Sequence, residues 1–162
     1  MSANLSPQID WQQLQQLFND TAFWAQDRPL ADLQTAVLNS HPVVSAIDGD
    51  RVIGFARATS DGVYRATIWD VIVHPDYQGA GIGRKLVQTI LSHPVVNKAE
   101  RVYLMTTNKQ QFYERIGFEV NSTTTMVLYN QPFEAVPMPL GDQQPVEPQF
   151  VEQQFAESQA GE

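Results

Sequence analysis

The chain has no cysteine, little positive charge and no long apolar run. Without cysteine there is no disulfide framework, no thiolate nucleophile and no zinc–thiolate site. No apolar stretch approaches the roughly 20 residues needed to cross a bilayer. The N-terminal "MSANLSPQID" lacks the basic and apolar regions of a signal peptide. We therefore expect no membrane partner and a cytoplasmic location.

Basic residues are outnumbered: 10 Lys and Arg stand against 18 Asp and Glu, for a net charge of −8 at pH 7. Residues 131–162 contain acidic residues but neither Lys nor Arg, so most of the negative charge lies there. No segment has the basic stripe that binding to a phosphate backbone requires, so we expect no nucleic-acid partner. The three histidines have no second His or carboxylate at ligand spacing, so we expect no metal site.

Hydrophobic spacing separates residues 1–130 from residues 131–162. In the first segment, apolar positions recur with helical spacing near residues 11–18, 30–37 and 82–90, and a short helix is expected after Asn108. Alternation predicts strands at 42–47, 51–58, 64–73 and 101–107, with two short ones near 118–120 and 124–129. This order predicts a single α/β (α+β) domain over 1–130 with a mixed sheet. Residues 131–162, rich in Pro, Gln and Glu, are predicted to form a disordered acidic tail.

Three glycines stand at alternate positions between the predicted strand 64–73 and the helix that follows, in "DVIVHPDYQGAGIGR". Gly79, Gly81 and Gly83 have no side chains, so a phosphate can approach the backbone closely. The first N–H groups of the following helix are unpaired and can donate to it. Gln78 and Arg84 add side-chain donors. A strand-to-helix turn without a ligand is the alternative. The spacing fits neither the dinucleotide fingerprint nor the Walker loop.

The pattern Gln78-x-x-Gly81-x-Gly83 resembles the [RQ]-x-x-G-x-[GA] motif of the GNAT superfamily, the acetyl-CoA-dependent N-acetyltransferases. A second feature of that family follows in "FYERIGF", residues 112–118, and the resemblance covers roughly residues 9–130. The stretch "ATIWDVIVHPDYQGAGIG" is similar to the plastid-type branch of plants and cyanobacteria. Members of that branch acetylate serotonin-like arylalkylamines, protein lysines or both.

The resemblance implies a GNAT-like fold, with a mixed, mostly antiparallel sheet flanked by about four helices. It also implies acetyl-CoA as co-substrate and a primary amine as acceptor. It implies that the N–H groups near Val71, Ile72 and Val73 pair with the pantetheine arm and polarise the thioester carbonyl. It also places the pyrophosphate on the loop, at residues Gln78, Gly79, Ala80, Gly81, Ile82, Gly83 and Arg84.

Two side chains are candidates for proton transfer. Asp70 interrupts the apolar run "ATIWDVIV", and a partly buried carboxylate there is a candidate base, acting directly or through a water; a purely structural role is the alternative. The family resemblance assigns Tyr113 as the acid beside the coenzyme sulfur, and a core aromatic is its alternative. Many members carry Asn or Asp seven residues before this tyrosine. Here the position is Thr106, and Asn108 is interpreted as a helix cap.

The acceptor and the activity remain open at this point. Phe23 and Trp24, between the first two helices, could form an aromatic wall for an arylalkylammonium or belong to the core. The leading function is an acetyl-CoA-dependent N-acetyltransferase. The alternative is a non-catalytic acyl-CoA-binding or interaction module on the same scaffold. Formation of a homodimer is left open.

Overall fold

The computed structural model describes residues 9–130, and the predicted acidic tail lies outside these residues. The chain divides into one compact unit up to Ser122 and a second unit from Thr123 onward. The helices and strands of residues 9–130 lie in the first unit, in the order α1 (Trp11–Thr21), α2 (Leu30–Leu38), β1 (Val43–Asp48), β2 (Arg51–Ser60), β3 (Arg65–Val73), the short 3₁₀ helix η1 (Pro75–Tyr77), α3 (Ile82–Ser92), α4 (Pro94–Asn97), β4 (Arg101–Tyr103) and α5 (Gln110–Glu114).

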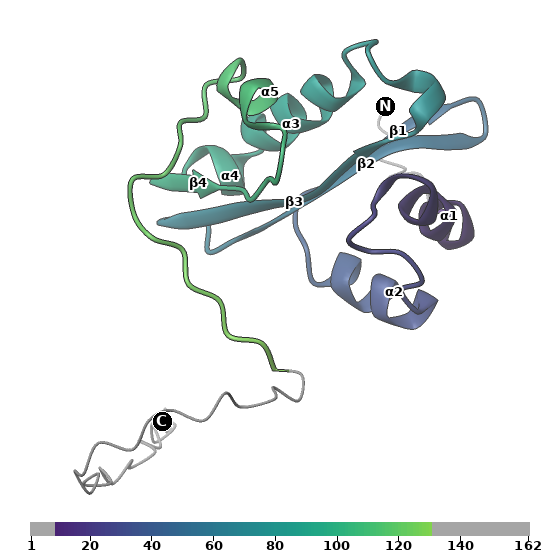
Figure 1. The fold of residues 1–162 in the computed structure, drawn as a ribbon, viewed down its shortest axis with the longest axis horizontal. Helices are drawn as coiled ribbons and strands as arrows, with labels where there is room; N and C mark the ends of the chain where they lie inside the picture. Colours follow the sequence, from purple (N-terminus) through teal and green to yellow (C-terminus); the bar gives the residue numbers. More distant parts are fainter. Residues whose placement is uncertain (1–8, 131–162) are drawn as a thin grey trace, which may run out of the picture. The chain divides into compact units, whose positions relative to one another are not determined.

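The strands form one sheet in the order β1-β2-β3-β4. β1 pairs with β2 and β2 with β3 in antiparallel fashion, whereas β3 and β4 are parallel. Helices α1 and α2 cover one face of the sheet, and α3 lies on the other together with α4 and α5 (Figure 1). The expected α/β class with a mixed, mostly antiparallel sheet is thereby confirmed.

Local sequence explains where the helices and turns form. The carboxylate of Asp10 accepts hydrogen bonds from the backbone N–H groups of Gln12 and Gln13, which caps α1 as predicted. Gly49 has a φ of +58° in the turn between β1 and β2, the conformation that a tight hairpin demands. His93 ends α3 and caps α4, with Pro94 at the first helical position.

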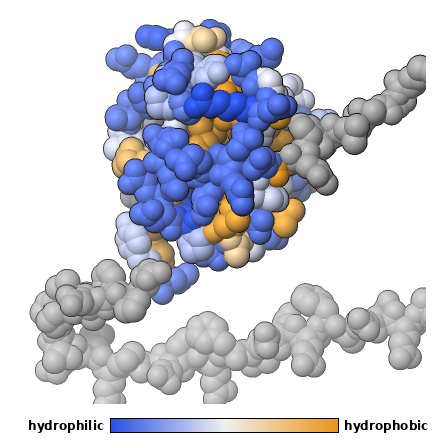
Figure 2. Space-filling model, turned by 90° about the vertical axis from the view of Figure 1, so that its right-hand side faces the viewer, coloured by the Kyte–Doolittle hydropathy of each residue, from blue (hydrophilic) through white to orange (hydrophobic). Residues whose placement is uncertain are grey.

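The sheet separates two apolar layers. The α1–α2 layer contains Leu14, Leu17, Phe18, Ala22, Ala25, Leu33, Val37, Val52, Phe55 and Ile72. The α3 layer is built around Ala56, Ala58, Ala66, Ile68, Leu86, Val87, Ile90 and Val96. Hydrophilic side chains predominate on the face seen in Figure 2, where apolar residues show only as small patches. Because each layer draws side chains from both β2 and β3, the register of these two strands decides which residues reach which face.

The two strands expected near residues 118–120 and 124–129 are absent from the structure. Residues 119–130 are all exposed, so their apolar side chains gain no burial there. Alternation is a local property, whereas a strand also needs a partner and a covered face, and a lone hairpin is marginally stable in water. The predicted strand at 101–107 is likewise shortened to β4.

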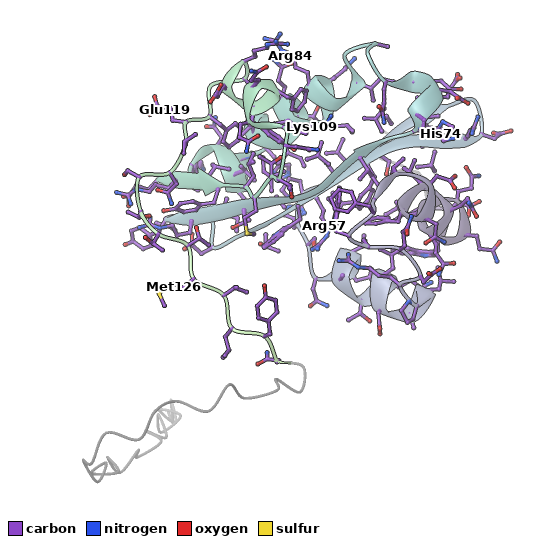
Figure 3. All side chains as sticks on the ribbon, in the orientation of Figure 1. Arg57, His74, Arg84, Lys109, Glu119 and Met126 are labelled. Atoms are coloured by element: carbon purple, nitrogen blue, oxygen red, sulfur yellow. The ribbon has the colours of Figure 1, made fainter. Side chains whose placement is uncertain are left out.

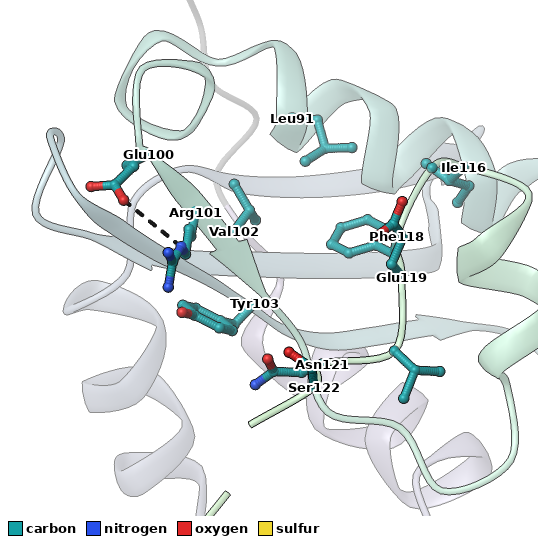
Figure 4. Close-up of a pocket in the computed structure, with 12 residues that line it drawn as sticks. Leu91, Glu100, Arg101, Val102, Tyr103, Ile116, Phe118, Glu119, Asn121 and Ser122 are labelled. Atoms are coloured by element: carbon teal, nitrogen blue, oxygen red, sulfur yellow. Dashed lines mark ion pairs between the residues drawn. The ribbon is translucent and has the colours of Figure 1, made fainter. Parts of the chain in front are cut away.

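A hollow of about 600 Å³ lies beside β4 and is lined in part by Leu91, Tyr103 and Phe118 (Figure 4). It follows from β4 being the last strand of the sheet, with no neighbouring strand on its outer side among residues 9–130. None of the residues predicted for catalysis or cofactor binding lines it. The candidate site therefore lies elsewhere, at the end of β3.

Candidate active site

The centre of β3 carries a β-bulge. Phe55 of β2 pairs with Ile72, and the next paired positions are Arg57 and Trp69, so that Ala56 faces both Asp70 and Val71. Asp70 has a φ of +54°, a left-handed conformation that is uncommon for a residue other than glycine. Bulges bend a strand and re-aim its side chains, and they are frequent beside active sites.

The Asp70 carboxylate is paired with a partly buried arginine. Nε of Arg57 donates a hydrogen bond to Oδ2 of Asp70 at 2.5 Å, and the two side chains are only 15% and 8% exposed. Among residues 9–130, no hydrogen bond partner is found for the second oxygen, Oδ1. Since no fully buried side-chain N or O atom in the described part of the chain lacks a partner, Oδ1 must reach solvent. One oxygen of Asp70 is thus held, and the other remains available.

The glycine loop follows directly from β3 and is anchored by side chains. Nε2 of Gln78 donates to the carbonyl oxygen of Val73 at 3.0 Å, so this side chain holds the loop to the strand. The backbone N–H of His74 donates to the carbonyl of Ile53, and its Nε2 lies 2.7 Å from an Arg51 nitrogen. His74 lies at the turn between strand and loop (Figure 3). The loop is therefore tied to β2 and β3 before it enters α3.

The three glycines have different physical roles. Gly79 and Gly81 both have a φ of +82°, and no atom lies within 4 Å of a Cβ placed on either. Gly81 is the N-cap of α3 and forms no side-chain cap, which leaves the first N–H groups of the helix to a ligand. At Gly83, a Cβ would lie 3.4 Å from the Phe112 ring and 3.6 Å from Val73, so this glycine permits close packing between α3 and α5.

Within residues 9–130, one side of β3 has no partner strand over most of its length. β3 and β4 pair at three positions, the last being Thr67 with Tyr103, and β3 then continues to Val73. The main chain of residues 68–73 is not paired with β4 on that side. An unpaired strand edge presents a row of N–H and C=O groups to which an extended, amide-containing molecule can bind. This edge leads directly to the glycine loop.

Tyr113 lies in the α3 layer, in the same apolar cluster as Val71, Val73 and Ile82. Its ring contacts those of Phe112 and Phe118, with centroids 4.9 Å and 5.9 Å apart. Within the described part of the chain, its hydroxyl has no hydrogen bond partner. Burial raises the pKa of the Tyr113 phenol, because the low-dielectric surroundings disfavour the phenolate. Tyr113 therefore carries its proton at neutral pH.

The structure brings some of the predicted site residues together and separates others. Val71, Val73, Ile82 and Gly83 converge with the α5 helix that carries Tyr113. The carboxylate of Asp70 points instead toward Arg57. The Ile72 side chain is buried in the α1–α2 layer, which leaves its backbone as the group that could contact a ligand.

The remaining loop residues are solvent-exposed. Ala80 and Arg84 are both exposed, and Arg84 extends outward at the periphery (Figure 3). Asn108 does not cap α5, whose N-cap is Lys109; the hydroxyl of Thr106 instead accepts a hydrogen bond from the Lys109 N–H.

Sequence reasoning missed Arg57 and Ser40. Arg57 stands in "RVIGFARA" between two alanines, and a cation within an apolar strand requires a partner just as Asp70 does. This shared requirement is the signal that could have linked the two residues. Ser40 follows α2 and has no distinctive sequence context.

Residues 9–130 contain no cluster of three or more His, Asp or Glu side chains that could hold a metal ion. No helix in that part of the chain combines the length and the apolar character needed to span a membrane.

Comparison with known proteins identifies the family. The model of the acetyltransferase (GNAT) family matches residues 11–118. A protein from Xanthomonas campestris that belongs to the GNAT family is 30% identical and superimposes with a TM-score of 0.65, covering 74% of this chain and 87% of that one. A GNAT-family acetyltransferase from Streptococcus pneumoniae is 28% identical, with a TM-score of 0.64 and coverages of 76% and 92%. The chain belongs to the GNAT acetyltransferase family, whose enzymes use acetyl-CoA as the acetyl donor.

Sequence relatives come from plants, plastids and cyanobacteria. The uncharacterized N-acetyltransferase ycf52 of Pyropia yezoensis is 35% identical over 115 residues, which cover 68% of this chain and 65% of the relative. The GCN5-related N-acetyltransferase 2, chloroplastic, of Arabidopsis thaliana is 35% identical, with coverages of 70% and 52%. The histone acetyltransferase TAP1 of Glycine max is 37% identical, with coverages of 58% and 46%. The chain thus matches about half to two thirds of the length of these relatives.

The raised pKa of Tyr113 predicts its behaviour in alkali. An ordinary tyrosine has a pKa of about 10, so between that pH and the higher pKa in the folded state, the phenol ionises only when the protein unfolds. Tyr113 therefore contributes stability that is present below pH ~10 and is lost as the pH rises further. The difference in phenolate absorbance between wild type and Tyr113→Phe, followed by ultraviolet titration, should develop only above pH ~10. A difference that develops well below this pH would contradict the buried environment.

Proposed function

We propose that this protein transfers the acetyl group of acetyl-CoA to a primary amine. The observation that carries the proposal is the unpaired edge of β3 at residues 68–73, which leads into two left-handed glycines at the start of α3. The amides of the pantetheine arm would pair with the strand edge, and the pyrophosphate would accept hydrogen bonds from the loop. The family membership supports acetyl-CoA as the ligand that joins these two features.

Under this proposal, Val71, Ile72 and Val73 contact the pantetheine arm through their backbones. Gly79, Ala80, Gly81, Ile82 and Gly83 surround the pyrophosphate through main-chain N–H groups at the start of α3. Gln78 contributes by fixing the loop, because its side chain is already bound to Val73. Arg84 is exposed and acts as a peripheral cation for the phosphates.

The reaction needs a base for the amine and an acid for the thiolate. A lysine-like amine has a pKa of about 10.4, so its deprotonation at pH 7 costs roughly 4–5 kcal/mol. Oδ1 of Asp70 accepts the ammonium proton, directly or through a water, and the amine attacks the thioester carbonyl. Backbone N–H groups at the bulge stabilise the tetrahedral oxyanion. When the C–S bond breaks, the coenzyme A thiolate takes the proton of the Tyr113 phenol, and the new amide nitrogen releases its second proton, which restores the phenol directly or through a water.

Two exposed aromatics favour an arylalkylamine as the acceptor. Phe23 and Trp24 lie between α1 and α2, are 68% and 51% exposed, and form an edge-to-face pair with centroids 5.0 Å apart. Neither belongs to the core, which was the other interpretation of the sequence. Aromatic faces attract ammonium groups and stack on aromatic rings. A protein lysine is the second candidate, because the relative from Glycine max is named a histone acetyltransferase.

The non-catalytic alternative would use the same cofactor contacts without turnover. An available carboxylate oxygen on Asp70 and a protonated Tyr113 favour the enzyme over this alternative. The cytoplasmic location, the domain boundary at residue 130 and formation of a homodimer stay predictions.

Two glycines with matching backbones test the cofactor loop. Gly81 and Gly62 have φ values of +82° and +77°, and at neither position would an added Cβ have an atom within 4 Å. Alanine at either position should therefore cost about 1–2 kcal/mol of folding stability. We expect Gly81→Ala to weaken acetyl-CoA binding roughly tenfold or more by calorimetry, equivalent to about 1.4 kcal/mol, and Gly62→Ala to leave it unchanged. Equal affinities for acetyl-CoA in the two variants would show that the loop does not bind the cofactor.

Release of free coenzyme A in the presence of an amine tests the activity itself. With acetyl-CoA and tryptamine, we expect steady turnover in the wild type and losses of roughly 10²-fold or more in Asp70→Asn and Tyr113→Phe. The loss in Asp70→Asn should shrink at high pH, where the amine is already deprotonated. Binding of acetyl-CoA without thiol release for any amine would favour the non-catalytic module.

The same assay assigns the acceptor class. Trp24→Ala should raise the Michaelis constant for tryptamine, whereas Tyr64→Ala, which removes an aromatic ring that is 62% exposed in another part of the fold, should not. A lysine peptide that outcompetes tryptamine, with no effect of Trp24→Ala, would favour the protein-lysine acceptor.

A further inference from the structure

We propose that Arg57 is a positioning residue that holds the Asp70 carboxylate in its reactive orientation. The inference rests on the proposed role of Asp70 as the base. Arg57 binds one carboxylate oxygen and leaves the other to accept the amine proton. Arg57 lies at the centre of the sheet, on the side of α1 and α2 (Figure 3). Under this proposal, Arg57 does not contact the substrate and acts through Asp70.

Three contacts from different elements fix the guanidinium group. Nε donates to Asp70 of β3, and NH1 donates to the hydroxyl of Ser40 at 2.9 Å, just after the end of α2. The Ser40 hydroxyl in turn donates to the carbonyl of Ala36, so its oxygen is oriented to accept from Arg57. The guanidinium carbon also lies 5.8 Å from the centre of the Trp69 ring. Such a fixed cation defines a direction for the carboxylate.

The neighbouring aromatic is itself held in place. Nε1 of Trp69 donates to the hydroxyl of Thr59 at 2.9 Å, which ties the ring to β2. Asp70 has a positive φ, and a strained conformation of this kind costs about 1–3 kcal/mol and persists only where the surroundings impose it. The ion pair with Arg57 supplies that restraint, because leaving either charge buried without a partner would cost more.

The geometry of the pair suits a base better than a simple structural link. A carboxylate that serves structure alone is commonly bound at both oxygens, as in the two-pronged pairing that arginine favours. Here Arg57 directs only Nε to Asp70 and donates from NH1 to Ser40. Oδ1 is thereby kept clear of protein donors while the carboxylate plane is fixed. The arrangement favours proton transfer at a single, defined oxygen.

A second arginine offers a matched control on the same sheet. Arg65 of β3 pairs with Glu100 at 3.5 Å, but these side chains are 46% and 54% exposed. Surface pairs of this kind contribute little to stability. Removal of Arg65 therefore tests the loss of an arginine without an effect on Asp70.

Kinetics with chemical rescue test the inference. We expect Arg57→Ala to lower kcat by about 10²-fold, as expected for a misplaced reacting group, with the affinity for acetyl-CoA unchanged. Methylguanidinium in solution should restore part of this loss in a saturable way, whereas tetramethylammonium at equal ionic strength should not. Arg65→Ala should keep the wild-type kcat and show no response. The double variant Arg57→Ala/Asp70→Asn should not be rescued.

The outcomes separate this inference from the proposed function. If Asp70→Asn keeps the wild-type kcat, Asp70 is not the base. The proposed mechanism and the positioning role of Arg57 then both fail. If Asp70→Asn is impaired while Arg57→Ala is not, only the role of Arg57 is overturned. Rescue of the double variant would show that methylguanidinium acts elsewhere and would also overturn it.

If Arg57→Ala does not fold, the variant Arg57→Lys tests the positioning role instead. The lysine keeps the charge but lacks the planar group that contacts Asp70 and Ser40 together. We expect kcat to fall roughly tenfold with unchanged acetyl-CoA affinity, and a wild-type kcat would contradict the role of the guanidinium geometry.

Discussion

The site depends on one shift of register in β3. In a regular strand, side chains two residues apart face the same side of the sheet. Ile68 lies in the α3 layer, so a regular strand would also direct Asp70 and Ile72 there. The bulge reverses this alternation, and Ile72 joins the α1–α2 layer while Val71 and Val73 reach the α3 layer. Asp70 is thereby spared burial among apolar side chains and meets Arg57.

The same shift gives the strand different neighbours on its two faces. On one side, Arg57 of β2 binds the carboxylate of Asp70 and is itself bound to Ser40, which follows α2. On the other, Val71 and Val73 pack with Ile82 and Tyr113, which joins the strand end to the start of α3 and to α5. Between these groups runs the backbone edge of residues 68–73, unpaired with β4. A thioester bound along this edge would lie between the proposed base and the proposed acid.

Sequence reasoning succeeded where short-range chemistry decides the structure. The Asp10 cap, the Gly49 hairpin and the left-handed glycines at 79 and 81 depend on neighbours within a few residues, and the structure has each of them. It failed where a distant partner decides. The alternation in residues 124–129 is typical of a strand, but in the described part of the chain these residues form no strand and are all exposed. The ion pair between Arg57 and Asp70 depends on the register of β2 against β3, which is a property of the whole sheet.

Under the proposed function, the β3 edge and the glycine loop bind a single ligand, acetyl-CoA. The most direct measurement is an amide nuclear magnetic resonance titration of the protein with acetyl-CoA. The account predicts that the amide signals of Val71–Val73 and of Gly79, Gly81 and Gly83 shift together with one dissociation constant, while those of the Gly62 turn stay in place. Shifts confined to only one of the two segments, or two distinct dissociation constants, would contradict it.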